Sequence, residues 1–461
     1  MSVLAIDIGS SRIKALLAGW DGRLTEVRSA RTPRRNAEPG EASYPVDEVV
    51  AAVERLIVEA SVFHDDAIDT LVFSCLGTAM APIAADGQPL APALAPDDRR
   101  PRADPRGLDS LGLNHDELRH RTGSDPAVPS FLWHAWWWRS VHPEVLDRTH
   151  RFRSLRGCLM ARLCGADVED HSWASRTMLY DLDAGDWSSP IIEAVGLSAE
   201  LFPPLAPSTV ALSIDPDTAQ RLGLASDARA VLGAMDNGCA HLGASGPGQA
   251  GLVDIVGTYE HLAGAASLDV ARAILQDAGG VIHAYPLDGR YIVMTRVLLG
   301  ELLRVISQRA DRELGTLLDG LSAEPTGSTV AADPGAVTAE LDAGRPPAEV
   351  LQGVLESAAA TLAGFADAWS AQGLTAEPVT VVGGGAAHPT VLQLKAALLG
   401  RSLVTLTSDE AAAIGALRLA AMGVRGATET EAGQLFADPV AQTITPPATV
   451  MARQSEGRHV S

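Results

Sequence analysis

The sequence predicts an α/β protein with two domains, and three observations support that fold class. The chain has 461 residues, which corresponds to about two or three domains of ordinary size. Short apolar strands alternate with segments of helical periodicity. A Gly- and Pro-containing break at 244–251 interrupts this pattern and is typical of a domain boundary. We therefore expect domains at 1–245 and 246–440, followed by a flexible tail at 441–461.

The first domain begins with a predicted strand, turn and second strand. Val3–Ile8 is an apolar run that stops at Gly9-Ser10-Ser11, and Ile13–Trp20 resumes as a strand. The periodicity then predicts a helix over 46–60, strands over 70–74, 81–84 and 230–235, and a long helical stretch over 114–163.

The second domain shows the same alternation. We expect a strand over 250–256, a long helix over 348–369, a strand over 378–382, and helices over 391–399 and 410–422. Strands ending in Gly and a hydroxyl residue occur in both halves, as Gly9-Ser10 and Gly257-Thr258. This suggests two halves that each offer a phosphate-binding turn.

Composition and charge exclude several classes of protein. The hydrophobic share of 46% and the charged share of 20% are those of a folded globular chain. A net charge of −21 repels a phosphate backbone, so nucleic acid is not an expected partner. No apolar run reaches the ~20 residues of a membrane span, and the N-terminus lacks a signal-peptide pattern. The four scattered cysteines read as buried free thiols, and a cytoplasmic location follows by default.

The segment Asp7-Ile8-Gly9-Ser10-Ser11-Arg12-Ile13-Lys14 is a candidate phosphate site. Its turn offers backbone N–H groups and the hydroxyls of Ser10 and Ser11, which suit phosphate oxygens. Asp7 could hold a metal-bound water, and Lys14 could add positive charge. An ordinary β-turn with an edge aspartate explains the same residues.

The segment Gly233-Ala234-Met235-Asp236-Asn237-Gly238 delivers an acidic residue at the carboxyl end of an apolar strand, where open α/β sheets bind ligands. Asp236 could accept the proton of a substrate hydroxyl as that hydroxyl attacks phosphorus. The alternative is an N-cap for the helix that begins near Asn237.

The segment Gly383-Gly384-Gly385-Ala386 lies between a predicted strand and a predicted helix, so a nucleotide could approach its backbone closely. Neither the Rossmann spacing nor a P-loop occurs in the chain. The tryptophans at 133, 136 and 137 have helical spacing, which favours core packing over stacking on a sugar ring.

Taken in order, these motifs resemble the FGGY family of carbohydrate kinases, over nearly the whole chain up to about Gly423. The segments that carry the resemblance are 7–14, Asp86-Gly87-Gln88-Pro89-Leu90 with Asp97-Asp98-Arg99, 170–177 with Asp181 and Trp187, Asp236, Gly257-Thr258, 383–386, Gln393 with Ala396 and Gly400, and 410–416.

The resemblance implies two actin-like (ribonuclease H-like) α/β domains with an interdomain catalytic cleft, in which Mg²⁺ and ATP meet a carbohydrate or polyol. It implies that Asp236 is the general base and that Mg²⁺ lies near Asp7. The residues that it assigns to the nucleotide and its phosphates are Gly9, Ser10, Ser11, Lys14, Gly257, Thr258, Gly300, Gly384, Gly385 and Ala386. Those that it assigns to the substrate are Gly77, Thr78, Asp97, Arg99 and Asp236. A homodimer is compatible with it.

The departures from the family pattern concern the choice of substrate. Xylulokinases of this family carry a Met-His pair where this chain reads Ser74-Cys75-Leu76-Gly77-Thr78-Ala79, and the Trp before the D-x-R is Ala95. Changed hydrogen-bonding groups imply a changed sugar, sugar acid or polyol.

Two other functions remain open. A catalytically silent regulator that binds sugar or nucleotide would keep the fold, but it has no need of a base at Asp236. An actin-like ATPase driven by a protein partner leaves Asp236 and Asp97-Asp98-Arg99 unexplained. Phosphorylation of a carbohydrate or polyol hydroxyl by ATP is the function that accounts for the whole set.

Overall fold

The computed structural model describes residues 1–64, 66–101, 107–246, 251–257, 259–384 and 388–447, and it divides into two compact units. Unit 1 consists of Met1–Gly243, Ile282–Tyr291 and Ala412–Ala437. Unit 2 consists of the described residues of Ala244–Val281, Ile292–Ala411 and Asp438–Ser461. Neither unit is one continuous stretch of sequence. The segments Ile282–Tyr291 and Ala412–Ala437 belong to unit 1, although they lie within the sequence of unit 2.

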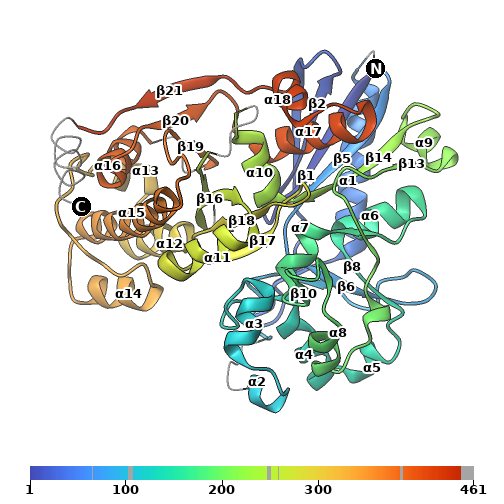
Figure 1. The fold of residues 1–461 in the computed structure, drawn as a ribbon, viewed down its shortest axis with the longest axis horizontal. Helices are drawn as coiled ribbons and strands as arrows, with labels where there is room; N and C mark the ends of the chain where they lie inside the picture. Colours follow the sequence, from blue (N-terminus) through green and yellow to red (C-terminus); the bar gives the residue numbers. More distant parts are fainter. Residues whose placement is uncertain (65, 102–106, 247–250, 258, 385–387, 448–461) are drawn as a thin grey trace. The chain divides into compact units, whose positions relative to one another are not determined.

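Unit 1 is built on a six-stranded sheet with the order β13-β14-β5-β1-β2-β3. Its strands are β1 (Ser2–Ile8), β2 (Arg12–Gly19), β3 (Leu24–Arg31), β5 (Ile68–Cys75), β13 (Ala211–Ser213) and β14 (Arg229–Met235). β1 pairs with β5 and β5 with β14 in parallel, whereas β2, β3 and β13 are antiparallel to their neighbours. In Figure 1 the blue strand β5 lies beside β14, which comes from much later in the chain.

Paired short strands and helices surround this sheet. The short strands are β4 (Ser43–Tyr44) with β7 (Ala93–Leu94), β6 (Met80–Ile83) with β8 (Arg151–Ser154), β9 (Glu169–Asp170) with β12 (Leu205–Ala206), and β10 (Tyr180–Asp181) with β11 (Asp186–Trp187). The helices are α1 (Val46–Val62), α2 (Gly107–Ser110), α3 (His115–Thr122), α4 (Phe131–Val141), α5 (Pro143–Leu146), α6 (Leu155–Cys164), α7 (His171–Ala174), η1 (Ser175–Thr177), α8 (Ser189–Ala194), η2 (Ala199–Leu201), α9 (Pro216–Leu222), α10 (Asp236–Ala244), α17 (Ala411–Arg425) and α18 (Glu429–Leu435).

Unit 2 repeats the plan of unit 1. Its sheet has the order β17-β18-β16-β15-β19-β20-β21, although most of β17 falls in the segment Ile282–Tyr291 that is grouped with unit 1. The central β15 is antiparallel to β16 and parallel to β19, as β1 is to β2 and β5. The strands are β15 (Val253–Val256), β16 (Glu260–Ala266), β17 (Val281–Ala284), β18 (Tyr291–Met294), β19 (Val379–Val382), β20 (Leu403–Leu406) and β21 (Val440–Ile444). The helices are α11 (Leu268–Ala278), α12 (Leu299–Ala310), α13 (Leu314–Leu318), α14 (Pro334–Asp342), α15 (Pro347–Ala371) and α16 (Pro389–Leu399).

Each unit has its own apolar core. Helix α1 buries Val49, Val53 and Leu56, which recur at the spacing of one helical face. In unit 2 the long α15 buries Val350, Val354 and many other apolar residues in a cluster shared with α12 and α14.

Two predictions differ from the structure. The stretch 114–163 contains helices α3 to α6 and strand β8 instead of one long helix. The breaks come at Gly123, which has a positive φ of 69°, and at Pro143, which starts α5; glycine and proline favour helix ends at such positions. Residues 441–444 of the predicted tail belong to strand β21, which pairs with β20. Residues 448–461 lie outside the described residues.

The prediction of buried free thiols is confirmed for two of the four cysteines. All four cysteines are free thiols; Cys75 and Cys239 are buried, whereas Cys158 and Cys164 are partly exposed. No helix within the described residues has the length and apolar character needed to cross a membrane.

A bulge near the end of β14 redirects the strand before Asp236. The register with β5 shifts between Val231 and Ala234, and Gly233 adopts a φ of +71°. A Cβ on Gly233 would lie 1.7 Å from the Phe73 carbonyl oxygen, so only glycine permits this approach of β14 to β5.

We expect Gly233→Ala to destabilise the protein by about 2–4 kcal/mol, because alanine adds a clash with β5 to a strained backbone conformation. Gly165→Ala is the matched control, since Gly165 has a φ of +64° with nothing within 4 Å of the new Cβ. It should cost only about 1–2 kcal/mol. Urea unfolding followed by tryptophan fluorescence measures both, and equal losses would contradict the close-packed bulge.

Candidate active site

The carboxyl ends of three parallel strands bring Asp7 and Asp236 together. Asp7 on β1 pairs with Ser74 of β5, and Met235 on β14 pairs with Cys75, the next residue of β5. Asp236 follows Met235 and is the first residue of α10. The two aspartates therefore emerge at the same edge of one sheet, where α/β proteins bind their ligands.

The protonation of Asp236 reflects this crowding. Burial and the neighbouring charge of Asp7 raise the pKa of Asp236 to about 7, against the lowering effects of the Asn237 N–H and Arg176. The Asn237 N–H donates to Asp236 Oδ1 at 2.8 Å. A carboxyl group with a pKa near neutrality is suited to accept a proton from a substrate.

The turn after β1 presents the predicted phosphate-binding groups. Ser10 and Ser11 are exposed, and the turn is closed by a hydrogen bond from the Gly9 N–H to the Arg12 carbonyl at 3.0 Å. Thr32, which follows β3, donates its Oγ1 hydrogen to the Gly9 carbonyl at 2.7 Å. This hydrogen bond stabilises the turn. Lys14 stands on β2 directly across from Asp7.

Ser74, near the end of β5, is hydrogen-bonded to Asp7. Its Oγ donates to Asp7 Oδ1 at 2.7 Å. Beyond β5, Thr78 is buried with a φ of +67°, a strained conformation for a β-branched residue. A Cβ on Gly77 would lie 2.8 Å from Arg176 Cγ. Gly77, Thr78 and Arg176 thus lie beside the two aspartates, as strained and close-packed residues often do at functional sites.

The predicted Asp97 and Arg99 are both exposed. Asp97 forms an ion pair with Arg34 at 2.5 Å, whereas the Arg99 N–H donates to the Gly40 carbonyl. The buried acid of this segment is instead Asp98, which pairs with the partly exposed Arg100 at 2.6 Å. This pair was not predicted, although the D-x-R spacing occurs twice in Asp97-Asp98-Arg99-Arg100.

Tyr44 is a second residue that the sequence analysis overlooked. Its side chain is fully buried, its hydroxyl has no partner among the described residues, and the Arg34 guanidinium lies 5.8 Å from its ring centre. Burial raises the pKa of Tyr44, and the charges of Asp97 and Asp236 add to this effect. Nothing in the local sequence around Tyr44 signals this position.

The spacing of Trp133, Trp136 and Trp137 predicted core packing, but of these three only Trp133 is buried. Trp136 is partly exposed, whereas Trp138, outside that spacing, is buried. Trp137 is partly exposed and receives the Arg100 guanidinium 5.2 Å from its ring centre, so it supports the Asp98 and Arg100 pair through a cation–π contact.

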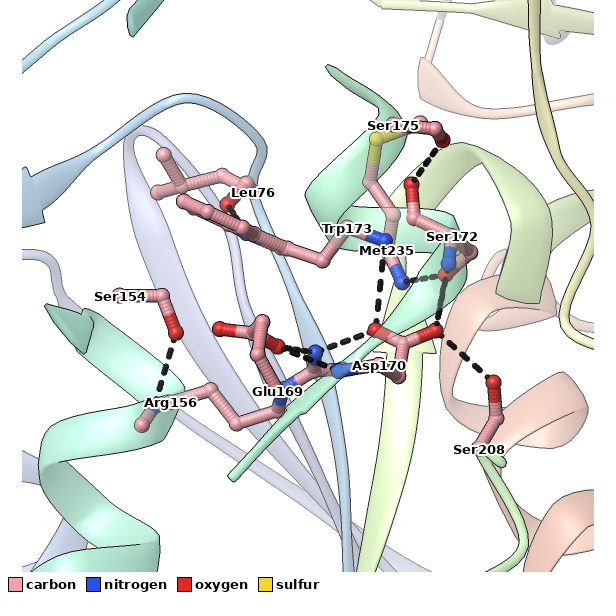
Figure 2. A network of polar contacts seen from close by, with 11 residues as sticks. Leu76, Ser154, Arg156, Glu169, Asp170, Ser172, Trp173, Ser175, Ser208 and Met235 are labelled. Carbon is pink, nitrogen blue, oxygen red and sulfur yellow. Dashed lines mark hydrogen bonds and ion pairs between the residues drawn. The ribbon is translucent and has the colours of Figure 1, made fainter. Parts of the chain in front are cut away.

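A network of buried polar groups extends from Arg156 to Met235, the residue before Asp236 (Figure 2). Arg156 on α6 contacts the carboxylates of Glu169 and Asp170, and all three side chains are fully buried. Burial alone would lower the pKa of Arg156, but these two carboxylates raise it overall. Ser172 Oγ donates to Asp170 Oδ2 at 2.5 Å and accepts the Met235 N–H at 3.0 Å. The network therefore reaches the residue that precedes Asp236.

Of the predicted nucleotide residues, Gly257, Gly300 and Gly384 lie in unit 2. Gly257 follows β15, and its N–H donates to the Tyr259 carbonyl at 3.0 Å. Gly383 and Gly384 follow β19, where a Cβ on Gly383 would lie 2.4 Å from the Val256 carbonyl oxygen. The Gly-rich turn and the second phosphate turn are thus neighbours. Gly300 is the second residue of α12. Thr258, Gly385 and Ala386 lie outside the described residues.

A buried lysine joins the two strands that flank the second phosphate turn. Lys395 on α16 contacts Asp254 of β15 at 2.7 Å and also contacts Glu260 of β16. Burial raises the pKa of Glu260 to about 7, with Lys395 opposing and Asp254 adding to the shift. Nearby, a hollow of about 210 Å³ is lined by Val381, Val382, Leu392, Thr405, Leu406, Ser408, Asp409 and Gln442. It contains none of the predicted nucleotide residues.

Family comparisons match both ends of the chain. The N-terminal domain model of the FGGY family of carbohydrate kinases matches residues 2–243, and its C-terminal domain model matches residues 328–424. The chain belongs to the FGGY family of carbohydrate kinases. This confirms the resemblance drawn from the ordered motifs and makes the chain a phosphotransferase by family.

Several characterised FGGY relatives are similar over most of this chain. A xylulose kinase of Bacillus subtilis is 24% identical over 448 residues, which cover 91% of this chain and 88% of the relative. A glycerol kinase of Ralstonia pickettii is 26% identical over 456 residues, covering 91% and 89%. A solved gluconate kinase of Lactobacillus acidophilus has a TM-score of 0.84 at 17% identity, covering 99% of this chain and 95% of that one. The structural match confirms the two-domain, actin-like fold of this FGGY kinase.

The raised pKa of Asp236 predicts how its replacement changes stability with pH. The folded state binds a proton at Asp236 more tightly than the unfolded state, so Asp236 makes folding less favourable as pH rises from about 4 to about 7. We therefore expect Asp236→Asn to raise the melting temperature near pH 8, with a gain that shrinks toward pH 4.

Differential scanning calorimetry across this pH range measures the effect. Asp288→Asn, at an exposed loop position, is the control for loss of one negative charge from the protein. A gain that is independent of pH, or that is equal in both variants, would contradict the raised pKa of Asp236.

Proposed function

We propose that this FGGY kinase transfers the γ-phosphoryl group of ATP to a hydroxyl of a sugar, sugar acid or polyol, with Asp236 as the general base. The observation that carries this proposal is a carboxyl group with a pKa of about 7 beside a second carboxylate at the carboxyl edge of the unit 1 sheet. General bases work best when their pKa lies near the working pH.

The proposed reaction needs one proton transfer. The Asp236 carboxylate accepts the proton of the acceptor hydroxyl as its oxygen forms a bond to the γ-phosphorus. The bond from the γ-phosphorus to the bridging oxygen breaks, and ADP leaves with that oxygen. A base at this position favours a kinase over a silent regulator, which performs no proton transfer.

The phosphate groups require donors and a cation. We assign the first turn, with Gly9, Ser10, Ser11 and Lys14, to phosphate oxygens of the transferred group. We assign Gly257, Gly300 and Gly384 of unit 2 to ATP, together with Thr258, Gly385 and Ala386 on the strength of the family motifs alone. Backbone N–H groups and hydroxyls in such turns bind phosphate without a positive protein charge.

The carboxylates fit a magnesium ion. Within the described residues no cluster of three or more His, Cys, Asp or Glu side chains could hold a metal by itself. Mg²⁺ commonly uses one or two carboxylates, with water and substrate phosphates as its other ligands, and Asp7 supplies one such carboxylate. When bound, Mg²⁺ would neutralise charge on the phosphate oxygens.

The acceptor is proposed to lie among Gly77, Thr78, Arg34, Asp97 and Asp236. The pair of the partly exposed Arg34 and the exposed Asp97 offers a guanidinium donor and a carboxylate acceptor, which suit vicinal hydroxyls or a sugar acid. We propose Asp98 with Arg100 as a support for this pocket. The relatives are named for xylulose, glycerol and gluconate, which defines the first panel of acceptors.

Coupled ADP release from Mg²⁺-ATP with D-xylulose, D-gluconate and glycerol tests the proposal. We expect turnover with at least one acceptor class, and a loss of about 10²–10⁴-fold in kcat for Asp236→Asn. The wild-type kcat/KM should fall below about pH 7, because the protonated base is inactive.

The control is again Asp288→Asn, which should retain wild-type turnover. Turnover that survives in Asp236→Asn would contradict the assignment of the base. If no sugar, sugar acid or polyol is phosphorylated while ATP still raises the melting temperature, the binding regulator becomes the better account.

A further inference from the structure

We propose that Ser172 is a positioning residue for Asp236, acting through the Met235 N–H from a hub formed by the buried Asp170 carboxylate. This inference rests on the proposed role of Asp236 and assigns a function to the buried network shown in Figure 2. Ser172 does not touch a reacting group. It fixes the backbone from which the base projects.

The end of β14 needs such an anchor. The bulge at Gly233 shifts the register of β14 on β5 before pairing resumes at Ala234 and Met235, and the Leu232 and Gly233 N–H groups donate to the carbonyls of Val210 and Ser208. Beyond the bulge, the Met235 N–H bonds to Ser172 Oγ at 3.0 Å. The backbone that leads into Asp236 is therefore held by a side chain of α7.

Ser172 can fill this role because Asp170 fixes its hydroxyl. Ser172 Oγ donates its only proton to Asp170 Oδ2 at 2.5 Å, so a lone pair of the oxygen is free for the Met235 N–H. Asp170 Oδ2 also accepts the Ser172 N–H at 2.9 Å. Ser172 is 1% exposed, so water does not compete for these bonds.

The same hub reaches the neighbouring strand. Trp173 Nε1 donates to the Leu76 carbonyl at 2.8 Å, immediately before Gly77 and Thr78 at the end of β5. Arg176, one turn further along, lies against Gly77 and favours the charged form of Asp236. One short segment, 170–176, thus contacts the ends of both strands that carry the proposed acceptor site.

Ser208 provides a control within the same network. Its Oγ donates to the same Asp170 Oδ2 at 2.8 Å, and the residue is 3% exposed. Its backbone carbonyl, which accepts the Gly233 N–H, is unchanged by alanine. Ser208→Ala and Ser172→Ala therefore each remove one buried hydroxyl from Asp170, but only Ser172→Ala releases the Met235 N–H.

The test compares wild type, Ser172→Ala and Ser208→Ala with Mg²⁺-ATP and whichever of D-xylulose, D-gluconate and glycerol gives the highest wild-type rate. We expect similar falls in melting temperature for the two variants. We expect kcat to fall about 10–100-fold only in Ser172→Ala, the scale of a misplaced catalytic group, with the KM for Mg²⁺-ATP near the wild-type value.

The pH profile separates positioning from general loss of stability. Release of the strand end exposes the half-buried Asp236 further to water, which lowers its pKa toward that of an ordinary carboxyl group. The acid limb of kcat/KM should therefore move to lower pH in Ser172→Ala and stay in place in Ser208→Ala.

Three outcomes are distinct. Wild-type kcat values and pH profiles in both variants would overturn the positioning role while leaving the kinase assignment intact. A kcat loss of the same size in both variants would also overturn it, because removal of either hydroxyl from Asp170 would then have the same effect as release of the Met235 N–H. Absence of turnover in the wild type with all three acceptors would instead overturn the proposed function on which this inference rests.

Discussion

The active-site edge of unit 1 depends on the buried charge of Asp170. Its carboxylate accepts hydrogen bonds from Ser172, Ser208 and the backbone of α7, and Arg156 compensates its charge. An unpaired buried carboxylate would cost several kcal/mol, so Arg156 and Asp170 require each other. Through them α6, α7 and β14 meet at one point, and the ends of β5 and β14 take their positions from it.

The same edge contains features that oppose stability. The carboxylates of Asp7 and Asp236 are neighbours, the β-branched Thr78 has a positive φ, and the bulge at Gly233 comes just before Asp236 in β14. Such strain persists when surrounding structure over-determines it. The saturated hydrogen bonds of Asp170 supply that support. A site with a raised carboxyl pKa and a rigid frame is what acid–base chemistry at neutral pH requires.

Local signals in the sequence predicted much of this arrangement. Apolar runs that end before Gly9 and Asp236 predicted β1 and β14, the two strands that lead into the candidate site. The order of the motifs predicted the family. The Asp170 network could not be predicted, because residues 156, 172, 208 and 235 meet only through tertiary packing. The choice of Asp98 over Asp97 as the buried acid is likewise set by contacts with Ala42 and Arg100. The helix breaks at Gly123 and Pro143 could have been predicted from the sequence, since glycine and proline are typical of helix ends.

The most direct test of the account is a ¹³C NMR titration of protein labelled at aspartate carboxyl carbons, with the Asp236 signal assigned from its absence in Asp236→Asn. The account predicts a titration near pH 7 that moves to lower pH in Asp7→Asn, because a like charge is removed. A titration near the ordinary carboxyl value of about 4, unchanged in Asp7→Asn, would contradict the paired carboxylates and the base that they create.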